Sequence, residues 1–228
     1  MSDAPVLLIT GASSGIGAAT AHRAVAAGRR VVLAARSVDK LEALAAELGG
    51  PGHAIAVATD VTDFASQEAL VATALERYGR LDGAFANAGF GAARGFLAET
   101  PEHWESMVLT NVLGAAFTIR ATLPALFESK GHLLLTGSVA GRRSINGSLY
   151  SATKFAVHGM AESLRQEVDG KIRVTVVAPG KTDTPFFDEK PEDALEPDDI
   201  ARAVLYAIEQ PFHVDVNEIL IRPTAQPN

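Results

Sequence analysis

Short apolar segments rich in β-branched residues alternate with longer segments of helical period along the chain. This alternation predicts a parallel sheet, because parallel strands need long crossover connections that are usually helical. Several segments are apolar without interruption, as expected for strands buried on both faces. We therefore expect an α/β fold with a doubly wound parallel sheet of about seven strands and helices on both faces. The predicted strands are Val6 to Thr10, Arg30 to Ala35, Ala54 to Ala58, Gly83 to Ala86, His132 to Thr136, Arg173 to Val177 and Glu218 to Ile221.

Length and charge narrow the class of protein. The 228 residues fit a single domain, residues 1–228, with a full hydrophobic core. The net charge is −7 and Lys and Arg are not clustered, so no nucleic-acid partner is expected. The longest apolar runs, such as Val31 to Ala35, are far shorter than the roughly 20 residues of a membrane span. No membrane partner is expected either.

The beginning of the chain and its metal-ligating residue types suggest location and chemistry. Residues 1–5 lead directly into the first predicted strand and contain no secretory signal pattern, so we expect a cytoplasmic protein. Cysteine is absent, which excludes disulfides and thiol nucleophiles. The six histidines lack HExxH-like spacing, so no metal site is expected.

A glycine-rich loop, Thr10 to Gly17, follows the first predicted strand and precedes an alanine-rich helical segment. Glycines permit a tight turn and close backbone approach to a pyrophosphate, which the N–H groups of the following helix attract. The spacing is Gly-x-x-x-Gly-x-Gly rather than the more familiar Gly-x-Gly-x-x-Gly. The loop predicts a dinucleotide phosphate site, with a simple strand-to-helix turn as the alternative.

Four polar residues suggest acid and base chemistry. Tyr150 and Lys154 are four residues apart in a helical segment, so they share one helix face. A free tyrosine has a pKa of about 10, and a nearby ammonium or an oxidised nicotinamide favours the phenolate. Ser138 ends a predicted strand, where it can bind a substrate oxygen, and Asn111 lies in an apolar helical segment. A chance helical pair and a core or capping asparagine are the structural alternatives.

The segment Thr10 to Gly17 resembles the phosphate loop of the short-chain dehydrogenase/reductase family, and later segments resemble that family in the same order. The resemblance implies a single-domain Rossmann-like fold. It implies that Asp60 and Val61 contact adenine, and that the segments 87–89 and 179–184 line the rest of the cofactor site. The expected cofactor-binding residues are Gly11, Ser13, Ser14, Gly15, Ile16, Gly17, Arg36, Ser37, Asp60, Val61, Asn87, Ala88, Gly89, Tyr150, Lys154, Pro179, Gly180, Thr182 and Thr184.

The same resemblance implies a catalytic tetrad of Asn111, Ser138, Tyr150 and Lys154, in which Asn111 holds a water linked to Lys154. The implied activity is hydride transfer between a nicotinamide cofactor and a carbonyl or alcohol, with Tyr150 as general acid and base. A non-catalytic NADP(H)-binding sensor or scaffold is one alternative, which the complete tetrad disfavours. An epimerase or dehydratase is another, but such relatives usually have a longer C-terminal region and a Gly-x-x-Gly-x-x-Gly loop.

Cofactor preference is expected to depend on the end of the second predicted strand, where an acidic residue would bind both ribose hydroxyls of NAD. The chain has Ala35-Arg36-Ser37 there and no carboxylate. Arg36 can form charge-assisted bonds to a 2′-phosphate, with Ser37 as a second donor. We therefore expect NADP(H) to be preferred over NAD(H), the alternative being that Arg36 is simply solvated.

Substrate identity is expected to depend on residues that face the nicotinamide. Phe186 and Phe187 suggest an apolar lid, whereas Lys181, Arg142 and Arg143 either accept an anionic group or are solvated. The whole set comprises Phe90, Arg94, residues 139–146 and residues 181–187.

The resemblance also extends to the C-terminal tail and implies an oligomeric state. Residues 217–224 resemble the tail of a bacterial subgroup that includes clavulanate dehydrogenase and hydroxy-acid dehydrogenases, which keeps hydroxy acids and aldehydes among the candidate substrates. Apolar stripes run along the predicted helices Glu102 to Glu128 and Tyr150 to Val168. Relatives pair such helices across two-fold axes, so a homodimer or homotetramer is implied.

Overall fold

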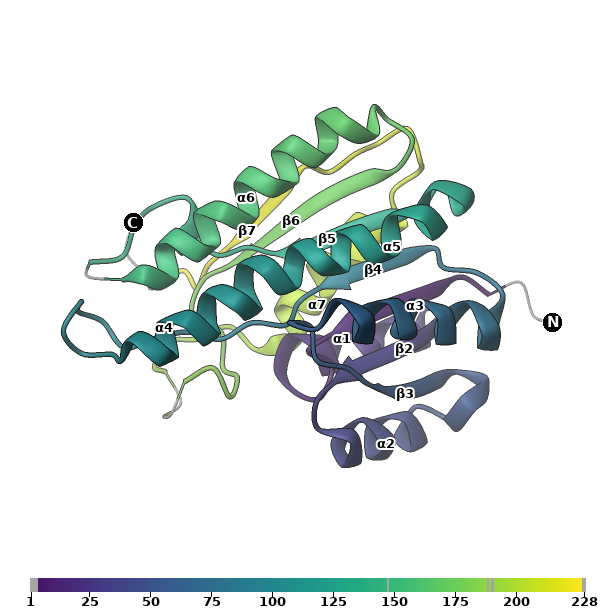
Figure 1. Cartoon of the computed structure of the whole chain (residues 1–228), viewed down its shortest axis with the longest axis horizontal. Helices are drawn as coiled ribbons and strands as arrows, with labels where there is room; N and C mark the ends of the chain where they lie inside the picture. The colour runs from purple at the N-terminus through teal and green to yellow at the C-terminus, as the bar shows by residue number, and fades with distance from the viewer. Residues whose placement is uncertain (1–3, 147, 188, 190, 227–228) are drawn as a thin grey trace.

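Seven parallel strands form one sheet in the computed structural model, which describes residues 4–146, 148–187, 189 and 191–226. Their order is β3-β2-β1-β4-β5-β6-β7, which confirms the predicted doubly wound α/β architecture (Figure 1). The strands are β1 (Val6–Thr10), β2 (Arg30–Ala35), β3 (Ala54–Ala58), β4 (Gly83–Ala86), β5 (His132–Thr136), β6 (Arg173–Pro179) and β7 (Glu218–Ile221). The helices are α1 (Gly15–Ala26), α2 (Val38–Glu47), α3 (Phe64–Tyr78), α4 (Pro101–Val108), α5 (Ala115–Ser129), α6 (Leu149–Val168) and α7 (Pro197–Glu209), with the 3-10 turns η1 (Gly50–Gly52) and η3 (Val139–Gly141) and the π-helical turn η2 (Leu109–Gly114).

The strand order reverses between β1 and β4. On one side of β1, Leu8 pairs with Val32 of β2, and on the other side Leu8 pairs with Ala84 of β4. The connections leave these two strands in opposite directions, so a crevice opens at their carboxyl ends. An open parallel sheet binds its ligand at this position.

Six strands have the predicted bounds, and β6 is longer than predicted. We expected it to end at Val177, whereas the strand continues to Pro179. The cause is β7, because Ala178 and Pro179 pair with Leu220 and Ile221 of that strand. Proline is tolerated at this position because the strand ends there.

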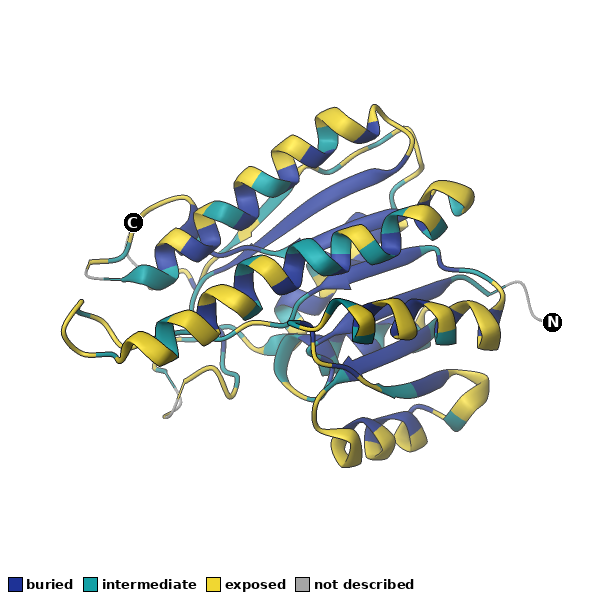
Figure 2. Cartoon of the chain, viewed as in Figure 1, coloured by how far each residue is buried: buried dark blue, intermediate teal, exposed yellow. Residues whose placement is uncertain are grey.

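A hydrophobic core covers each face of the sheet. Adjacent residues of β1 belong to different cores, since side chains alternate along a strand. Leu8 packs with Leu133 on the face covered by α3, α5 and α6, and Ile9 packs with Phe85 on the other face. Each such side chain contributes about 1.5–3 kcal/mol by leaving water. Figure 2 shows the strands as the buried layer between helices that are exposed on their outer sides.

The helix predicted from Glu102 to Glu128 is a continuous run, Pro101–Ser129, which contains the π-helical turn η2. By length and composition alone this run could cross a membrane. Its most apolar 18-residue segment has a mean hydropathy of 1.3, and 33% of that segment is buried. No such segment was expected from the sequence. Its inner side carries Leu126, which belongs to the core, and Thr118, which donates to the side chain of Gln67 on α3 at 2.8 Å.

His132 is a buried imidazole on β5, opposite Arg173 of β6. Its Nε2 lies 2.7 Å from Thr175 Oγ1, and that hydroxyl donates its only proton to the Val216 carbonyl at 2.6 Å. The Nε2–H of His132 must therefore be the donor to Thr175. Burial, together with the nearby Arg173 guanidinium, lowers the pKa of His132 to about 3.

His132 should make the protein sensitive to acid. The unfolded chain takes up a proton on this residue near pH 6.5, whereas the folded chain resists protonation down to about pH 3. Stability is therefore lost as the pH falls through this window, by at most about 1.4 kcal/mol per pH unit. We expect His132→Leu to flatten this slope in urea unfolding between pH 6 and 4. His213→Gln, which removes an exposed imidazole, should leave the slope as in the wild type; equal slopes in both variants would contradict the assignment.

Candidate active site

A cleft of about 500 Å³ lies at the carboxyl ends of the strands. Of the 20 or so residues predicted for the cofactor and the tetrad, Gly17 and Asn111 do not line it. The others do: Gly11, Ser13, Ser14, Gly15, Ile16, Arg36, Ser37, Asp60, Val61, Asn87, Ala88, Gly89, Ser138, Tyr150, Lys154, Pro179, Gly180, Thr182 and Thr184. The structure thus brings together residues from the carboxyl ends of six strands, β1 to β6, and from the helix α6.

The glycine-rich loop forms one wall of the cleft. Gly11 and Gly15 have φ angles of 65° and 53°, in the left-handed region that favours glycine. Gly17 lies below the loop, where a Cβ atom would collide with the carbonyl oxygen of Gly11 and approach Ala12 Cα to 3.0 Å. Gly17 thus lets the loop fold closely over α1, and its assignment to the cofactor-binding loop stays a prediction.

Asn87 and Thr10 connect three strand ends beneath this loop. Asn87 Nδ2 donates to the carbonyls of Thr10 and Gly11, at 3.0 and 3.3 Å. Thr10 Oγ1 accepts from the N–H groups of Asn87 and Ala88, at 3.0 and 3.1 Å. The Thr136 hydroxyl of β5 donates to Asn87 Oδ1 at 3.0 Å. These bonds fix the loop relative to β4 and β5.

The carboxyl end of β2 carries an exposed cation on the cleft. Arg36 lines the cleft and, within the described part of the chain, has no ion-pair partner. The carboxyl group of Asp60 accepts from the hydroxyl and N–H of Thr62, at 2.7 and 2.9 Å. These bonds, helped by the nearby Arg36, hold the pKa of Asp60 below its usual value. The glycine cradle suits a dinucleotide phosphate, and Arg36 adds a positive charge at the same cleft.

Ser138, Tyr150 and Lys154 meet on the floor of the cleft. The Ser138 hydroxyl lies close enough to the phenol of Tyr150 to lower the pKa of that phenol, and it accepts from the N–H of Ala140 at 3.0 Å. Lys154 Nζ donates to the Thr136 carbonyl at 2.8 Å and lies 5.7 Å from the centroid of the Tyr150 ring. The helix α6 carries Tyr150 and Lys154 one turn apart, as predicted.

Burial dominates the electrostatics of this trio. It raises the pKa of Tyr150 to about 12, although the hydrogen bond from Ser138 acts in the opposite direction. Burial also lowers the pKa of Lys154 to about 8. The pKa of Tyr150 was expected to fall beside Lys154 and an oxidised nicotinamide, whereas in the protein alone burial raises it. Burial disfavours the charged form of Lys154 as well as that of Tyr150. The lysine therefore does not offset the effect of burial on the pKa of the phenol.

Asn111 is buried in the turn η2, behind the cleft wall. Its Oδ1 accepts from the Phe90 N–H at 3.0 Å. Its Nδ2 donates to the Phe90 carbonyl at 2.8 Å and to Thr153 Oγ1 at 3.2 Å. Both amide protons are therefore used in connecting the loop after β4 to α6, next to Lys154. The side chain of Asn111 supports the cleft and does not line it.

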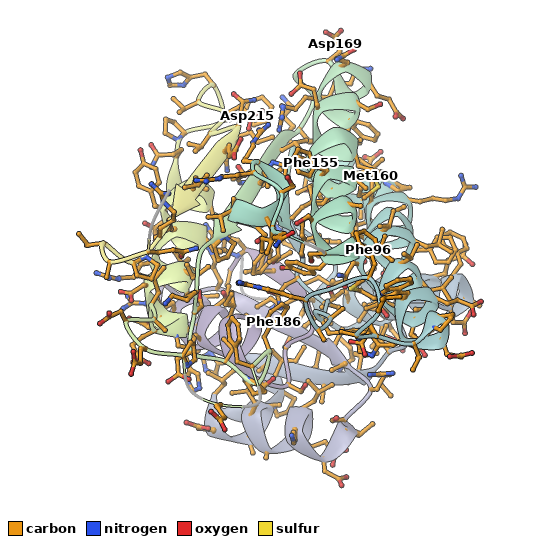
Figure 3. The ribbon with its side chains drawn as sticks, turned by 90° about the vertical axis from the view of Figure 1, so that its left-hand side faces the viewer. Phe96, Phe155, Met160, Asp169, Phe186 and Asp215 are labelled. Carbon is orange, nitrogen blue, oxygen red and sulfur yellow. The ribbon has the colours of Figure 1, made fainter. Side chains whose placement is uncertain are left out.

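An aromatic group closes the substrate end of the cleft. The ring of Phe186 lies 5.4 Å from that of Tyr150 and 5.0 Å from that of Phe187, in edge-to-face contacts. Gly91 provides the space, since a Cβ atom there would collide with the Phe186 ring. Figure 3, which faces this end of the molecule, shows Phe186 and Phe96 on the same side, from the loops after β6 and β4. The predicted apolar lid thus lies over the tyrosine.

The cations predicted for an anionic substrate group are mostly engaged elsewhere. Arg142 pairs with Glu218 and, like Arg143, does not line the cleft. Lys181 lines the cleft, but its Nζ donates to the Glu192 carbonyl at 2.9 Å. Arg94 also lines the cleft and is the remaining cation of the predicted substrate set there.

Sequence reasoning missed Gly91, which accommodates Phe186, and Gln226, which lines the cleft and accepts from the Lys181 N–H at 2.9 Å. No sequence pattern pointed to Gln226, because it reaches the cleft only through the path of the chain after β7.

The whole chain is similar to known oxidoreductases. The family model described as short chain dehydrogenase matches residues 5–195. An uncharacterized oxidoreductase of Listeria monocytogenes is 39% identical over an alignment of 241 residues, which covers 97% of each chain. One of Staphylococcus aureus is 38% identical over 224 residues, 96% of each chain.

Solved structures share the fold over nearly the full length. An alcohol dehydrogenase from the archaeon Thermococcus sibiricus, complexed with 5-hydroxy-NADP, has a TM-score of 0.92 at 33% identity and covers 99% of both chains. A metagenomic short-chain oxidoreductase in complex with NADP has a TM-score of 0.84 at 34% identity, with 97% of this chain and 98% of that chain covered. A 3-ketoacyl-(acyl-carrier-protein) reductase from Brucella melitensis, complexed with NADH, has a TM-score of 0.88 at 30% identity, covering 96% and 97%.

Gly17→Ala tests the cradle. The added methyl meets backbone atoms that cannot move aside, so we expect a loss of stability of about 1–3 kcal/mol and at least a tenfold weaker binding of NADPH, measured by fluorescence titration. Gly159→Ala is the matched control, because Gly159 is an exposed glycine of α6 with free space around its Cα. It should stabilise the protein by up to about 1 kcal/mol and leave NADPH binding unchanged. Equal affinities in the two variants would contradict the role given to Gly17.

Proposed function

This chain belongs to the short-chain dehydrogenase family, and on that premise we propose that it is an NADP(H)-preferring oxidoreductase that interconverts a carbonyl and an alcohol. The observation that carries the proposal is the meeting of Ser138, Tyr150 and Lys154 beside the glycine cradle. A nucleotide phosphate site and a proton-transfer site then lie in one cleft, as hydride transfer requires. Membership of the family is consistent with an oxidoreductase, and the relatives are named as such.

NADP(H), when bound, supplies or accepts the hydride. Tyr150 gives a proton to the substrate oxygen in reduction and removes it in oxidation. Ser138 holds that oxygen and, through its hydrogen bond to the phenol, the tyrosine itself. Lys154, whose pKa of about 8 leaves it largely protonated at neutral pH, provides positive charge next to the phenol. Asn111 fixes the backbone that flanks Lys154, and a water on this side would pass the proton on toward solvent.

The pKa of Tyr150 sets the protonation state from which each direction of the reaction begins. A phenol whose pKa burial raises to about 12 stays protonated at neutral pH and is ready to act as an acid. Reduction of a carbonyl therefore needs no prior ionisation of Tyr150. Oxidation needs the phenolate, which the positive charge of an oxidised nicotinamide would favour. We accordingly assign carbonyl reduction as the direction for the assay.

Tyr150→Phe tests the assignment of the acid and base. The variant keeps the ring that contacts Phe186 but removes the hydroxyl, so we expect unchanged NADPH affinity and a turnover at least about 100-fold lower. The measurement is NADPH oxidation against a panel of aldehydes, ketones and keto acids. Tyr206→Phe, an exposed tyrosine of α7, is the control. Wild-type turnover in Tyr150→Phe would overturn the assignment, and tight NADPH binding without turnover of any compound by the wild type would favour a sensor.

Cofactor preference is proposed from Arg36, because relatives are seen with NADP and with NADH. Ala35→Asp places a carboxylate next to Arg36 on the cleft, where it repels a 2′-phosphate and can accept from ribose hydroxyls. We expect the ratio of kcat/KM for NADPH over NADH to fall at least tenfold. Ala58→Asp is the matched control, since Ala58 pairs with Ala35 in the sheet but does not line the cleft. An unchanged ratio in Ala35→Asp, or a fall of the same size in both variants, would count against this assignment.

The proposal also covers the oligomeric state, the cellular location and the partners of the protein. Exposed apolar side chains lie on the outer sides of α4, η2 and α6, among them Val108, Leu113 and Phe155; Figure 3 labels Phe155 and Met160 on one helix. We expect a homodimer or homotetramer through these helices, in the cytoplasm and without a nucleic-acid or membrane partner. A monomeric mass by light scattering at micromolar concentration would refute the oligomer.

A further inference from the structure

His158 lies on α6 one turn beyond Lys154, on the same helix face as Tyr150. Its side chain is 5% exposed. Within the described part of the chain neither ring nitrogen makes a hydrogen bond of good geometry, which is unusual for a buried imidazole, although the backbone of Ser138 lies close enough to act on the ring. The proposed catalysis does not use it, so its presence beneath the active site needs another explanation.

The turn that carries Ser138 is wrapped around this imidazole. Gly137 and Gly141 flank the turn, and a Cβ atom on either would lie within 2.7 Å of a ring atom of His158. The backbone at both glycines thus approaches the ring as closely as it can. Within the turn, the Gly141 N–H donates to the Ser138 carbonyl at 2.9 Å. The turn therefore packs directly on the imidazole ring in this conformation.

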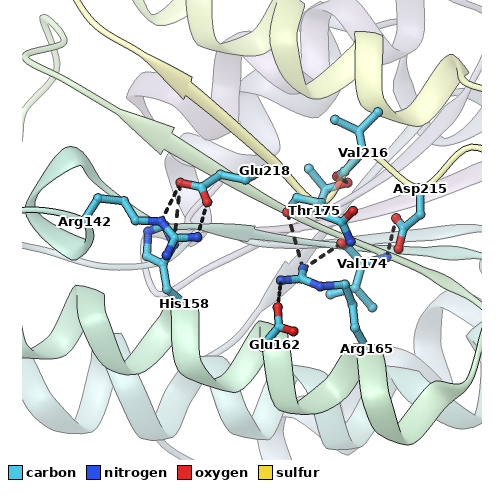
Figure 4. Close-up of polar contacts among 10 residues, drawn as sticks. Arg142, His158, Glu162, Arg165, Val174, Thr175, Asp215, Val216 and Glu218 are labelled. Atoms are coloured by element: carbon cyan, nitrogen blue, oxygen red, sulfur yellow. Dashed lines mark hydrogen bonds and ion pairs between the residues drawn. The ribbon is translucent and has the colours of Figure 1, made fainter.

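The edge strand β7 holds the other side of the ring. Glu218 Oε1 lies 3.8 Å from His158 Nδ1 and accepts from Arg142 Nε at 2.8 Å, while Arg142 Nη2 pairs with Glu218 Oε2 (Figure 4). Arg142 follows η3 directly, so Glu218 is bonded to the end of the Ser138 turn and faces the ring beneath it. Lys154 is the remaining charged group near the imidazole, and desolvation, despite Glu218, keeps the pKa of His158 below its usual value.

We infer that His158 is a positioning residue for Ser138, and that Glu218 holds it and the turn in register through Arg142. This inference rests on the proposed function only for the role of Ser138. The neutral ring supports the turn from below, and the ion pair prevents the turn from lifting away. Loss of either support should loosen the turn before it affects the glycine loop of the cofactor cradle, which follows β1.

Hydrogen exchange of the whole protein tests this positioning without a substrate. We expect His158→Ala to speed exchange of the amides of residues 140–142 at least tenfold, and Glu218→Gln about threefold, with β5 unchanged. Glu162→Gln is the matched control: it removes a 2.7 Å ion pair with Arg165 on the same helix, beside the same strand, without touching the turn (Figure 4). It should leave exchange at residues 140–142 as in the wild type.

The kinetic readout separates positioning from general destabilisation. With a substrate found for the wild type, we expect kcat of His158→Ala to fall about tenfold at a temperature well below its melting point, with the Kd for NADPH within twofold. Unchanged exchange at residues 140–142 in Glu218→Gln and in His158→Ala would overturn the inference. If His158→Ala does not fold, the comparison of amide exchange at residues 140–142 between Glu218→Gln and Glu162→Gln decides whether the inference holds. Absence of turnover in the wild type would refute the proposed function, while the exchange result would still decide the positioning role.

Discussion

The hydrogen bonds of Asn87 hold the ends of β1, β4 and β5 together, and the rest of the site depends on them. The glycine loop begins at the end of β1, and the backbone carbonyl that holds Lys154 belongs to Thr136, the residue that donates to Asn87. One amide side chain is therefore shared by the phosphate cradle and the proton-transfer group. The backbone at these strand ends and the hydrogen bonds of Asn87 therefore set the distance between the two halves of the site.

Much of this architecture could be predicted from the sequence, since a sheet buried on both faces imposes apolar strands whose ends are visible. The bounds of six strands follow from that rule alone, and β6 fails only because its last pairs depend on β7, about 40 residues later. Residues directly after strand ends, such as Ser138 and Asn87, were placed correctly for the same reason. A parallel sheet brings all of its carboxyl ends to one edge.

Failures occurred where a residue's role depends on a distant partner. Arg142 was left open between a substrate cation and a solvated one, and Glu218 binds it instead. Asn111 was left open between a catalytic and a structural role, and its amide is used by Phe90 and Thr153. The pKa of Tyr150 was misjudged because helical spacing reveals its neighbour Lys154 but not the burial of both. Solvent exclusion is a property of the assembled fold, and local spacing contains little information about it.

The path of the chain after β7 has a practical consequence for anyone who labels or immobilises this protein. Gln226 lies in the wall of the cleft, while Val6 begins β1 at the other end of the sheet, and Figure 1 shows the two termini on opposite sides of the molecule. A fluorophore, affinity tag or surface linker attached after Gln226 would be tethered beside this cleft. The same attachment at the N-terminal end would leave that cleft facing solution.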